Sequence, residues 1–156
     1  MKIALFPGSF DPITKGHQDI IERATPLFDK IVVGIGTNTA KKYLFSIEER
    51  TQWIKTTFEK NKKIEVLPYK GLTVDFCREI GANYILRGLR NSSDFNYESS
   101  IGQMNKALDH QIETICLLTS PEFTAINSTI VRDIIINKGD ASKFVPSVIK
   151  QHFINK

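Results

Sequence analysis

The residues best suited to chemistry lie near the start of the chain, in the stretch Gly8-Ser9-Phe10-Asp11-Pro12-Ile13-Thr14-Lys15-Gly16-His17. The apolar run before it, Ile3 to Phe6, predicts a short buried strand that the following proline and glycine end. An amphipathic helix is predicted to start near His17. The first turn of a helix offers free N–H groups and a positive dipole end to phosphate, and the side chains of Ser9 and His17 add donors there. The stretch therefore predicts a phosphate-binding loop, with an ordinary strand–loop–helix connection as the alternative.

Two basic segments could also bind phosphate. Lys41 and its neighbour Lys42 lie in a polar loop, where Lys41 could act as a movable point charge. A pair of solvated surface lysines is the alternative. The segment Arg87-Gly88-Leu89-Arg90 directly follows a predicted strand, and guanidinium groups fork onto phosphate oxygens in a fixed geometry. Here the alternative is that both arginines pair with local carboxylates, such as Asp94 or Glu98.

The elements that must position these residues alternate along the chain. Hydrophobic patterning predicts strands at 3–6, 30–35, 64–67, 84–86 and 113–118. It predicts helices at 17 to about 26, 46 to about 58, 72–80, 93–108, 129–138 and 146–155. A capping box at Ser46 starts the second of these helices, and Thr73 is expected to cap the third. No linker or repeat divides the sequence. We therefore expect one domain, residues 1–156, with an α/β fold: a Rossmann-like, doubly wound, five-stranded parallel sheet with helices on both faces.

In such sheets ligands bind outside the carboxyl ends of the strands, where the strand order reverses. The unusual polar residues of this sequence fall at those ends. They are Ser9 after the first strand, Lys41 after the second, Thr73 after the third, Arg87 and Arg90 after the fourth, and Ser128 and Thr129 after the fifth. We therefore expect them to gather at one edge of the sheet.

The composition is that of an ordinary globular protein, with 41% hydrophobic and 24% charged residues and a net charge of +4. The mild positive charge suits an anionic ligand, either a nucleotide or a nucleic acid. No apolar run approaches the roughly 20 residues of a membrane span, and the first one is too short for a signal peptide, so we expect a cytoplasmic protein without a membrane partner. Cys77 and Cys116 form no metal motif and are expected to be reduced and buried, whereas His110 and His152 are expected at the surface.

Four motifs together resemble the nucleotidylyltransferase superfamily. Its signature is a G-[ST]-F-D-P loop, matched at 8–12, and an [HT]-x-G-H helix start, matched at 14–17. Thr14 in place of the first histidine, and R-G-L-R at 87–90 followed by D-F-x-Y-E at 94–98, resemble the phosphopantetheine adenylyltransferases in particular. Residues 126–132 resemble the superfamily's I-S-S-[ST]-x-[IV]-[RK] segment, which holds the β- and γ-phosphates of ATP. Departures from the usual residues occur at Asn91, Asn96, Ala125 and Asn127.

The resemblance implies transfer of AMP from ATP to 4′-phosphopantetheine, giving dephospho-coenzyme A and pyrophosphate, with Mg²⁺ as cofactor and a homohexamer as the assembly. It implies that His17 and Lys41 are catalytic, with His17 stabilising the transition state at the α-phosphate. It places phosphopantetheine at Ser9, Lys41, Thr73, Arg87 and Asn105. It places ATP at Ser9, Phe10, His17, Gly88, Leu89, Arg90, Glu98, Phe123, Thr124, Ala125, Ile126, Asn127, Ser128 and Thr129, and it assigns no residue to a metal.

The implied chemistry suits these residue types. A phosphate nucleophile is already an anion at neutral pH, so donors and cations are required and a general base is not. A sister enzyme that adenylylates nicotinamide mononucleotide is the nearest alternative, and residues 87–98 argue against it. A nucleic-acid-binding protein is the alternative from another class, but the sequence has no basic helix and no basic stripe interleaved with aromatic residues.

Overall fold

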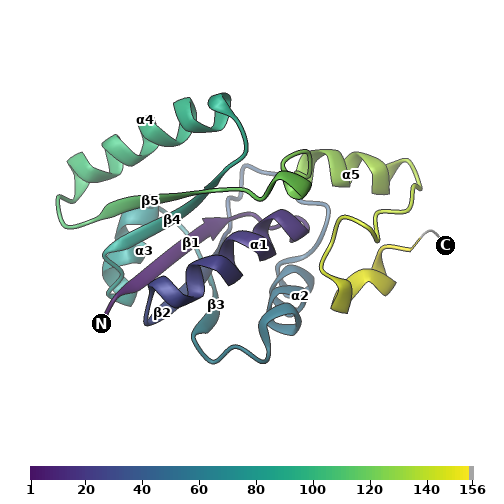
Figure 1. Ribbon diagram of the computed structural model, residues 1–156, viewed down its shortest axis with the longest axis horizontal. Helices are drawn as coiled ribbons and strands as arrows, with labels where there is room; N and C mark the ends of the chain where they lie inside the picture. The colour runs from purple at the N-terminus through teal and green to yellow at the C-terminus, as the bar shows by residue number, and fades with distance from the viewer. Residues whose placement is uncertain (155–156) are drawn as a thin grey trace.

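The computed structural model describes residues 1–154, and these form a five-stranded parallel sheet in the order β3-β2-β1-β4-β5 (Figure 1). The strands are β1 (Ile3–Gly8), β2 (Lys30–Gly36), β3 (Ile64–Tyr69), β4 (Tyr84–Leu89) and β5 (Glu113–Leu118). The α-helices are α1 (Lys15–Ala24), α2 (Ile47–Phe58), α3 (Thr73–Ile80), α4 (Ser92–Leu108) and α5 (Ser128–Ile136). Short 3₁₀ helices are η1 (Thr25–Leu27), η2 (Pro121–Phe123) and η3 (Ser147–His152). The predicted α/β architecture is confirmed.

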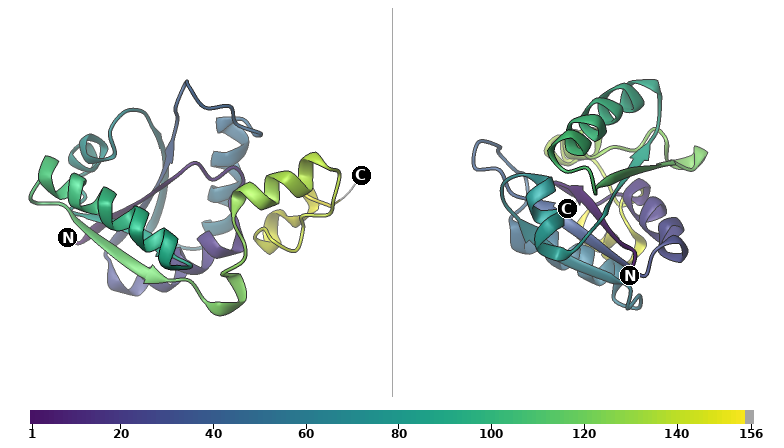
Figure 2. Two further views of the ribbon diagram at one scale, coloured as in Figure 1. Left: turned by 90° about the horizontal axis from the view of Figure 1, so that it is seen from above. Right: turned by 90° about the vertical axis from the view of Figure 1, so that its left-hand side faces the viewer.

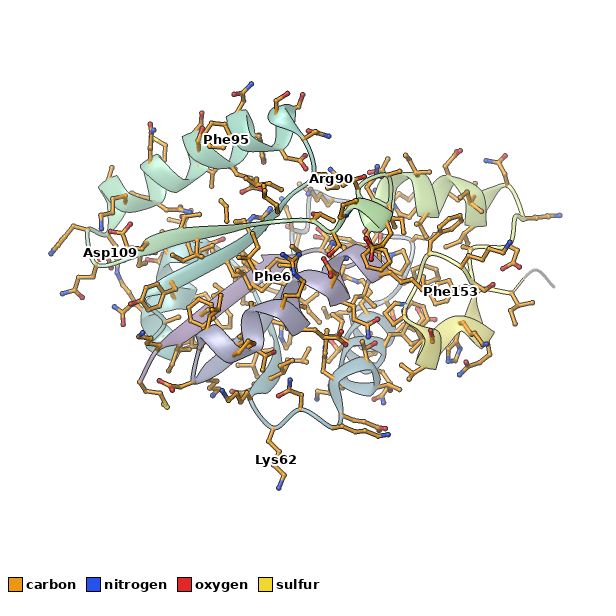
Figure 3. All side chains as sticks on the ribbon, in the orientation of Figure 1. Phe6, Lys62, Arg90, Phe95, Asp109 and Phe153 are labelled. Atoms are coloured by element: carbon orange, nitrogen blue, oxygen red, sulfur yellow. The ribbon has the colours of Figure 1, made fainter. Side chains whose placement is uncertain are left out.

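Helices cover both faces of the sheet, as Figures 1 and 2 show with α1 and α3 on opposite sides. Alternate residues of β1 explain this arrangement. Ala4 and Phe6 enter a core shared with α1 and α2, whereas Ile3 and Leu5 enter a second core with α3. Figure 3 shows Phe6 among the side chains at the centre of the molecule. Burial on both faces is why these strands read as continuous apolar runs.

The sheet opens between β1 and β4, at the point where the strand order reverses. β1 pairs with β2 along its whole length, but it pairs with β4 only at Ala4 and Leu5. The strand therefore continues through Pro7 to Gly8, two residues beyond the predicted end. The carbonyl of Pro7 faces the gap and accepts a hydrogen bond from Arg87 at 2.6 Å, so the missing proline N–H interrupts no ladder.

Other boundaries differ from the sequence prediction for local reasons. α1 starts at Lys15 rather than near His17, because Thr14 is its N-cap. β3 continues through Pro68, which an edge strand tolerates. The predicted cap of α3 by Thr73 is wrong: Leu72 is the N-cap residue, no side chain caps the helix, and the Thr73 hydroxyl pairs with that of Tyr69 instead.

The capping box at Ser46 and Glu49, by contrast, starts α2 as predicted.

The C-terminal segment and the cysteines correct two further expectations. The predicted α-helix at 146–155 is a 3₁₀ helix, Ser147–His152, and its predicted last residue lies outside the described range. Cys77 is buried, but Cys116, on the edge strand β5, is exposed. Both cysteines are free. Within residues 1–154, no helix combines the length and the apolarity needed to span a bilayer.

Candidate active site

Two cavities flank the gap between β1 and β4. The first, of about 410 Å³, lies among the carboxyl ends of β1–β4, the loop after β2, and helices α3 and α4; we call it the α3–α4 cavity. The second, of about 350 Å³, lies among the N-terminal ends of α1 and α5 and the start of α4; we call it the α1–α5 cavity. The residues that line both are Pro7, Gly8, Ser9, Arg87 and Glu98. The two cavities therefore meet at the point where β1 and β4 separate.

The α3–α4 cavity contains every residue predicted to bind the acceptor. Ser9, Lys41, Thr73, Arg87 and Asn105 all line it. Further lining residues, for which no role was predicted, include Thr37, Tyr69, Tyr97, Ile101 and Gly102. Those on α4 could have been found, because residues 97, 101 and 105 repeat at a spacing of four and lie on one helix face.

The α1–α5 cavity contains most of the residues predicted to bind ATP. Ser9, Phe10, His17, Gly88, Arg90, Glu98, Ile126, Asn127, Ser128 and Thr129 line it. Leu89, Phe123, Thr124 and Ala125 do not line it, and their contact with ATP stays a prediction. Arg132, which ends the 126–132 motif, lines the cavity as well, and no role was predicted for it.

His17 is held in one tautomer by the start of its own helix. The backbone N–H of Thr14 donates to His17 Nδ1 at 3.1 Å, and the Thr14 hydroxyl accepts from the His17 N–H. Burial, and then the positive charges of Arg87 and Arg90, lower the pKa of His17 from 6.5 to about 4. The ring is therefore neutral at pH 7. Because Nδ1 accepts, Nε2 carries the proton and is the donor available to the α1–α5 cavity.

The loop before α1 folds tightly around Phe10. This residue has a φ of +48° and is 2% exposed, and its ring packs edge-on against His17 at 5.0 Å. A Cβ on Gly8 would lie 3.0 Å from the Phe10 ring, closer than an ordinary van der Waals contact, so a side chain at position 8 would press on that ring. The Phe10 ring therefore supports His17 in the cavity wall.

The two arginines of residues 87–90 are paired with carboxylates. Arg87 donates to both oxygens of Glu98, at 2.8 and 2.5 Å, and Arg90 makes a similar forked pair with Asp94. Burial would raise the pKa of Asp94, but the hydrogen bonds from Arg90 outweigh it and lower that pKa. The pairing that the sequence left as an alternative is thus present, and it fixes both guanidinium groups in the cavity walls. Figure 3 labels Arg90 where the chain passes from β4 into α4. Binding of phosphopantetheine by Arg87, and of ATP by Arg90 and Glu98, stays a prediction.

The start of α5 is tied to the loop before α1. Asn127 caps α5 through the N–H of Ile130 at 2.9 Å, a role that asparagine fills well in place of the usual serine. The Ser128 hydroxyl donates to the carbonyl of Pro12 at 3.0 Å, and Arg132 donates to the carbonyl of Asp11 at 2.9 Å. Two helix N-termini therefore converge on the α1–α5 cavity, which favours a polyanionic ligand there.

Comparison with known proteins identifies the family of this chain. The family model described as cytidylyltransferase-like matches residues 5–134. The phosphopantetheine adenylyltransferase of Flavobacterium psychrophilum is 51% identical over 150 residues, which cover 96% of this chain and 99% of that protein. That of Leuconostoc citreum is 52% identical over 150 residues, covering 96% of this chain and 94% of that protein.

A solved structure supports the fold alone. The bifunctional NMN adenylyltransferase/ADP ribose pyrophosphatase of Francisella tularensis superposes with a TM-score of 0.72 at 21% identity, over 94% of this chain and 45% of that one. The family model and the two near full-length relatives show that this chain belongs to the cytidylyltransferase-like family and, within it, to the phosphopantetheine adenylyltransferases.

Proposed function

We propose that this protein transfers the AMP group of ATP to the phosphate of 4′-phosphopantetheine, giving dephospho-coenzyme A and pyrophosphate. The observation that carries the proposal is 51% identity, over 96% of the chain, to a phosphopantetheine adenylyltransferase. The motifs of that family fall around two connected cavities. This is the arrangement that a reaction between two phosphorylated substrates requires.

Each cavity suits one substrate. The α1–α5 cavity, at two helix N-termini, would take the triphosphate of ATP. The α3–α4 cavity would take phosphopantetheine: Tyr97, Ile101 and Gly102 on its α4 wall suit an uncharged chain, and Lys41 and Arg87 suit its phosphate. Ser9 and Arg87 line both cavities, so the reacting phosphates would meet beside them.

The proposed step is an in-line displacement. A phosphate oxygen of phosphopantetheine forms a bond to the α-phosphorus of ATP while the bond from that phosphorus to pyrophosphate breaks. The nucleophile is an anion at neutral pH, since a phosphate monoester has a second pKa of about 6. His17 would donate its Nε2 proton as a hydrogen bond to an α-phosphate oxygen, and Lys41 would place its charge between the reacting phosphates. The chain therefore contributes orientation and charge stabilisation.

Mg²⁺ is the expected cofactor, and the chain offers it few free ligands. Three carboxylates beside the cavities are already engaged: Asp11 by backbone N–H groups, Asp94 by Arg90 and Glu98 by Arg87. Among residues 1–154, His, Cys, Asp and Glu form no group of three that could hold a metal. We therefore assign Mg²⁺ to the phosphates of ATP and give none of these residues a role as its ligand.

A homohexamer is also part of the proposal. It is supported by large apolar side chains on α4 and β5 that are more than half exposed, namely Phe95, Tyr97, Met104, Leu108 and Leu118. An exposed apolar face of this kind marks an interaction surface. Light scattering should give six times the 17.7 kDa mass of one chain, and a monomer would contradict this assembly.

Because the proposed reaction consumes ATP, the expected location of the protein is the cytoplasm.

Pyrophosphate release tests the function directly. The purified protein is given ATP, Mg²⁺ and either 4′-phosphopantetheine or nicotinamide mononucleotide. We expect phosphopantetheine to release pyrophosphate far faster, with dephospho-coenzyme A as the second product by mass spectrometry. Equal rates, or faster release with nicotinamide mononucleotide, would overturn the assignment.

A further inference from the structure

Asp11 and Arg50 are charged side chains that are almost completely buried, each with 2% exposure. Neither is a predicted site residue, and within residues 1–154 no ion pair joins either of them to another side chain. Their hydrogen bonds go to backbone groups instead. A buried charge is costly unless it is fully hydrogen-bonded, so such an arrangement needs a reason.

Asp11 ties the phosphate loop to the segment that carries Lys41. Its Oδ2 accepts the N–H of Leu44 at 2.8 Å, and its Oδ1 accepts the N–H of Phe45 at 2.9 Å. Both carboxylate oxygens are therefore used, one for each of two successive amides. Leu44 and Phe45 lie at the end of the largely exposed segment 37–46.

Arg50 makes the same connection from α2. Its Nη1 donates to the carbonyl of Ser9 at 2.7 Å, and its Nε donates to the carbonyls of Phe45 and Ser46 at 3.1 and 3.3 Å. Its guanidinium carbon also lies 4.1 Å from the ring centre of Tyr43. One side chain thus holds Ser9 on one side and residues 43–46 on the other.

Phe45, whose backbone binds both Asp11 and Arg50, is also held by the packing of its ring. The ring packs edge-on against Trp53 of α2, with centres 4.8 Å apart, and against Phe153 at 5.8 Å. From this anchor back to Lys41 the segment has its own bonds. The N–H of Lys41 donates to Asn38 at 3.0 Å, and the N–H of Asn38 donates to the Tyr43 hydroxyl at 2.9 Å. These bonds connect the Lys41 turn to Tyr43, two residues before Phe45.

We infer that Asp11 and Arg50 are positioning residues that set the separation of Ser9 and Lys41. The inference rests on the proposed function, in which these two residues bridge the reacting phosphates. Lys41 is exposed, and a lysine carries its charge on a flexible four-carbon stem, so the backbone position sets where the charge can reach. Errors of about 1 Å in such a position cost about 10²-fold in rate. Asp11 and Arg50 act on the reaction only through this geometry.

A double-mutant cycle tests the inference. Asp11→Asn keeps the size of the side chain but replaces one of the two acceptor oxygens with an amide donor. We expect kcat to fall by about five- to tenfold, no more than the loss expected from Lys41→Ala, with a smaller change in the KM for ATP. In a Lys41→Ala background the same change should alter kcat by less than about twofold, because the group that Asp11 positions is already gone.

Equal fold-losses in the two backgrounds would overturn the inference, because they would indicate general damage to the fold. So would a folded Asp11→Asn protein with wild-type kcat. The matched control is Asp29→Asn, since Asp29 is an exposed carboxylate that also accepts a backbone N–H, that of Lys2, far from the loop. Its kcat should match wild type. If Asp11→Asn does not fold, Arg50→Lys enters the same cycle, because lysine cannot reach both segments at once.

Hydrogen exchange on the wild-type protein gives a test that needs neither a variant nor activity. The amides of Leu44 and Phe45 should exchange about tenfold or more slowly compared with those of Thr39 and Lys42 in the same segment. Leu44 is 39% exposed, so lack of solvent contact does not account for such protection. Equal exchange at all four amides would overturn the inference even in an enzyme that uses phosphopantetheine. Slow exchange at residues 44 and 45 in a protein inactive with it would instead count against the proposed function alone.

Discussion

The α1–α5 and α3–α4 cavities share a wall but are built in different ways. The first combines local helix caps, at Thr14 and at Asn127, with hydrogen bonds that tie the start of α5 to the loop before α1. The second is assembled from segments that are far apart in the sequence, with the exposed Lys41 on one side and α4 on the other. The first cavity therefore has hydrogen bonds across its own walls, whereas the second depends on how the loops and α4 are placed.

This difference matches what the proposed reaction requires of each cavity. Charge develops at the α-phosphate in the transition state, and stabilising it requires donors that need no rearrangement. The acceptor is long, and binding it requires walls spread over several elements. We therefore expect changes in the α1–α5 cavity to act on kcat, and changes at the outer walls of the α3–α4 cavity to act on acceptor binding.

The largest effect is expected from His17→Ala. Removing a donor aimed at transition-state charge should lower kcat by about 10²–10³-fold, while ATP affinity changes much less because the helix N-termini remain. The capping bond to Thr14 is also lost, which should cost about 1 kcal/mol of stability. The measurements are kcat, ATP affinity and thermal midpoint, with His110→Ala as a control at the surface. A folded variant with kcat within threefold of wild type would make His17 a helix-start residue only.

The second prediction concerns the pH dependence of stability. The unfolded chain protonates His17 near pH 6.5, whereas the folded protein does so only near pH 4. Between these values the unfolded state binds more protons, so stability should fall as the pH is lowered from 6.5 to 4, by at most about 3 kcal/mol from this group. Denaturant unfolding of wild type and His17→Ala at several pH values checks this. Parallel curves for the two proteins would show that His17 is not the cause.

A smaller effect is expected from Lys41→Ala. In the proposed reaction this exposed residue would act through its charge alone, so we expect a loss of about tenfold in kcat, with a rise in the KM for phosphopantetheine. Lys42→Ala is the matched control, since Lys42 is adjacent and does not line the α3–α4 cavity. If both variants behave alike, Lys41 is only part of a solvated surface.

Much of the fold and of the local motifs was predictable from the sequence. The alternation of elements, the capping box at Ser46 and the gathering of polar residues at the strand ends depend on patterns within a few residues or on general rules for parallel sheets. Polar strand-end residues such as Ser9 and Thr73 could be placed at one edge for that reason.

What could not be predicted depends on partners distant in sequence. The extension of β1 through Pro7 requires the separation from β4, and the roles of Asp11 and Arg50 require contact between the loops after β1 and β2. Cys116 is exposed on β5, at the edge of the sheet. The spacing of residues along the sequence does not show these contacts, because they form only once the chain has folded.

The most direct test of the division between the cavities is a pair of binding titrations on two variants. Ser128→Ala changes the α1–α5 cavity, and Asn105→Ala changes the α3–α4 cavity. Calorimetric titration with a non-reactive ATP analogue and with phosphopantetheine gives four dissociation constants to compare with wild type. We predict that Ser128→Ala weakens the ATP analogue and that Asn105→Ala weakens phosphopantetheine, each by about five- to tenfold, with the other ligand within about twofold. If either variant weakens both ligands equally, or if the pattern is reversed, the two cavities do not divide the substrates.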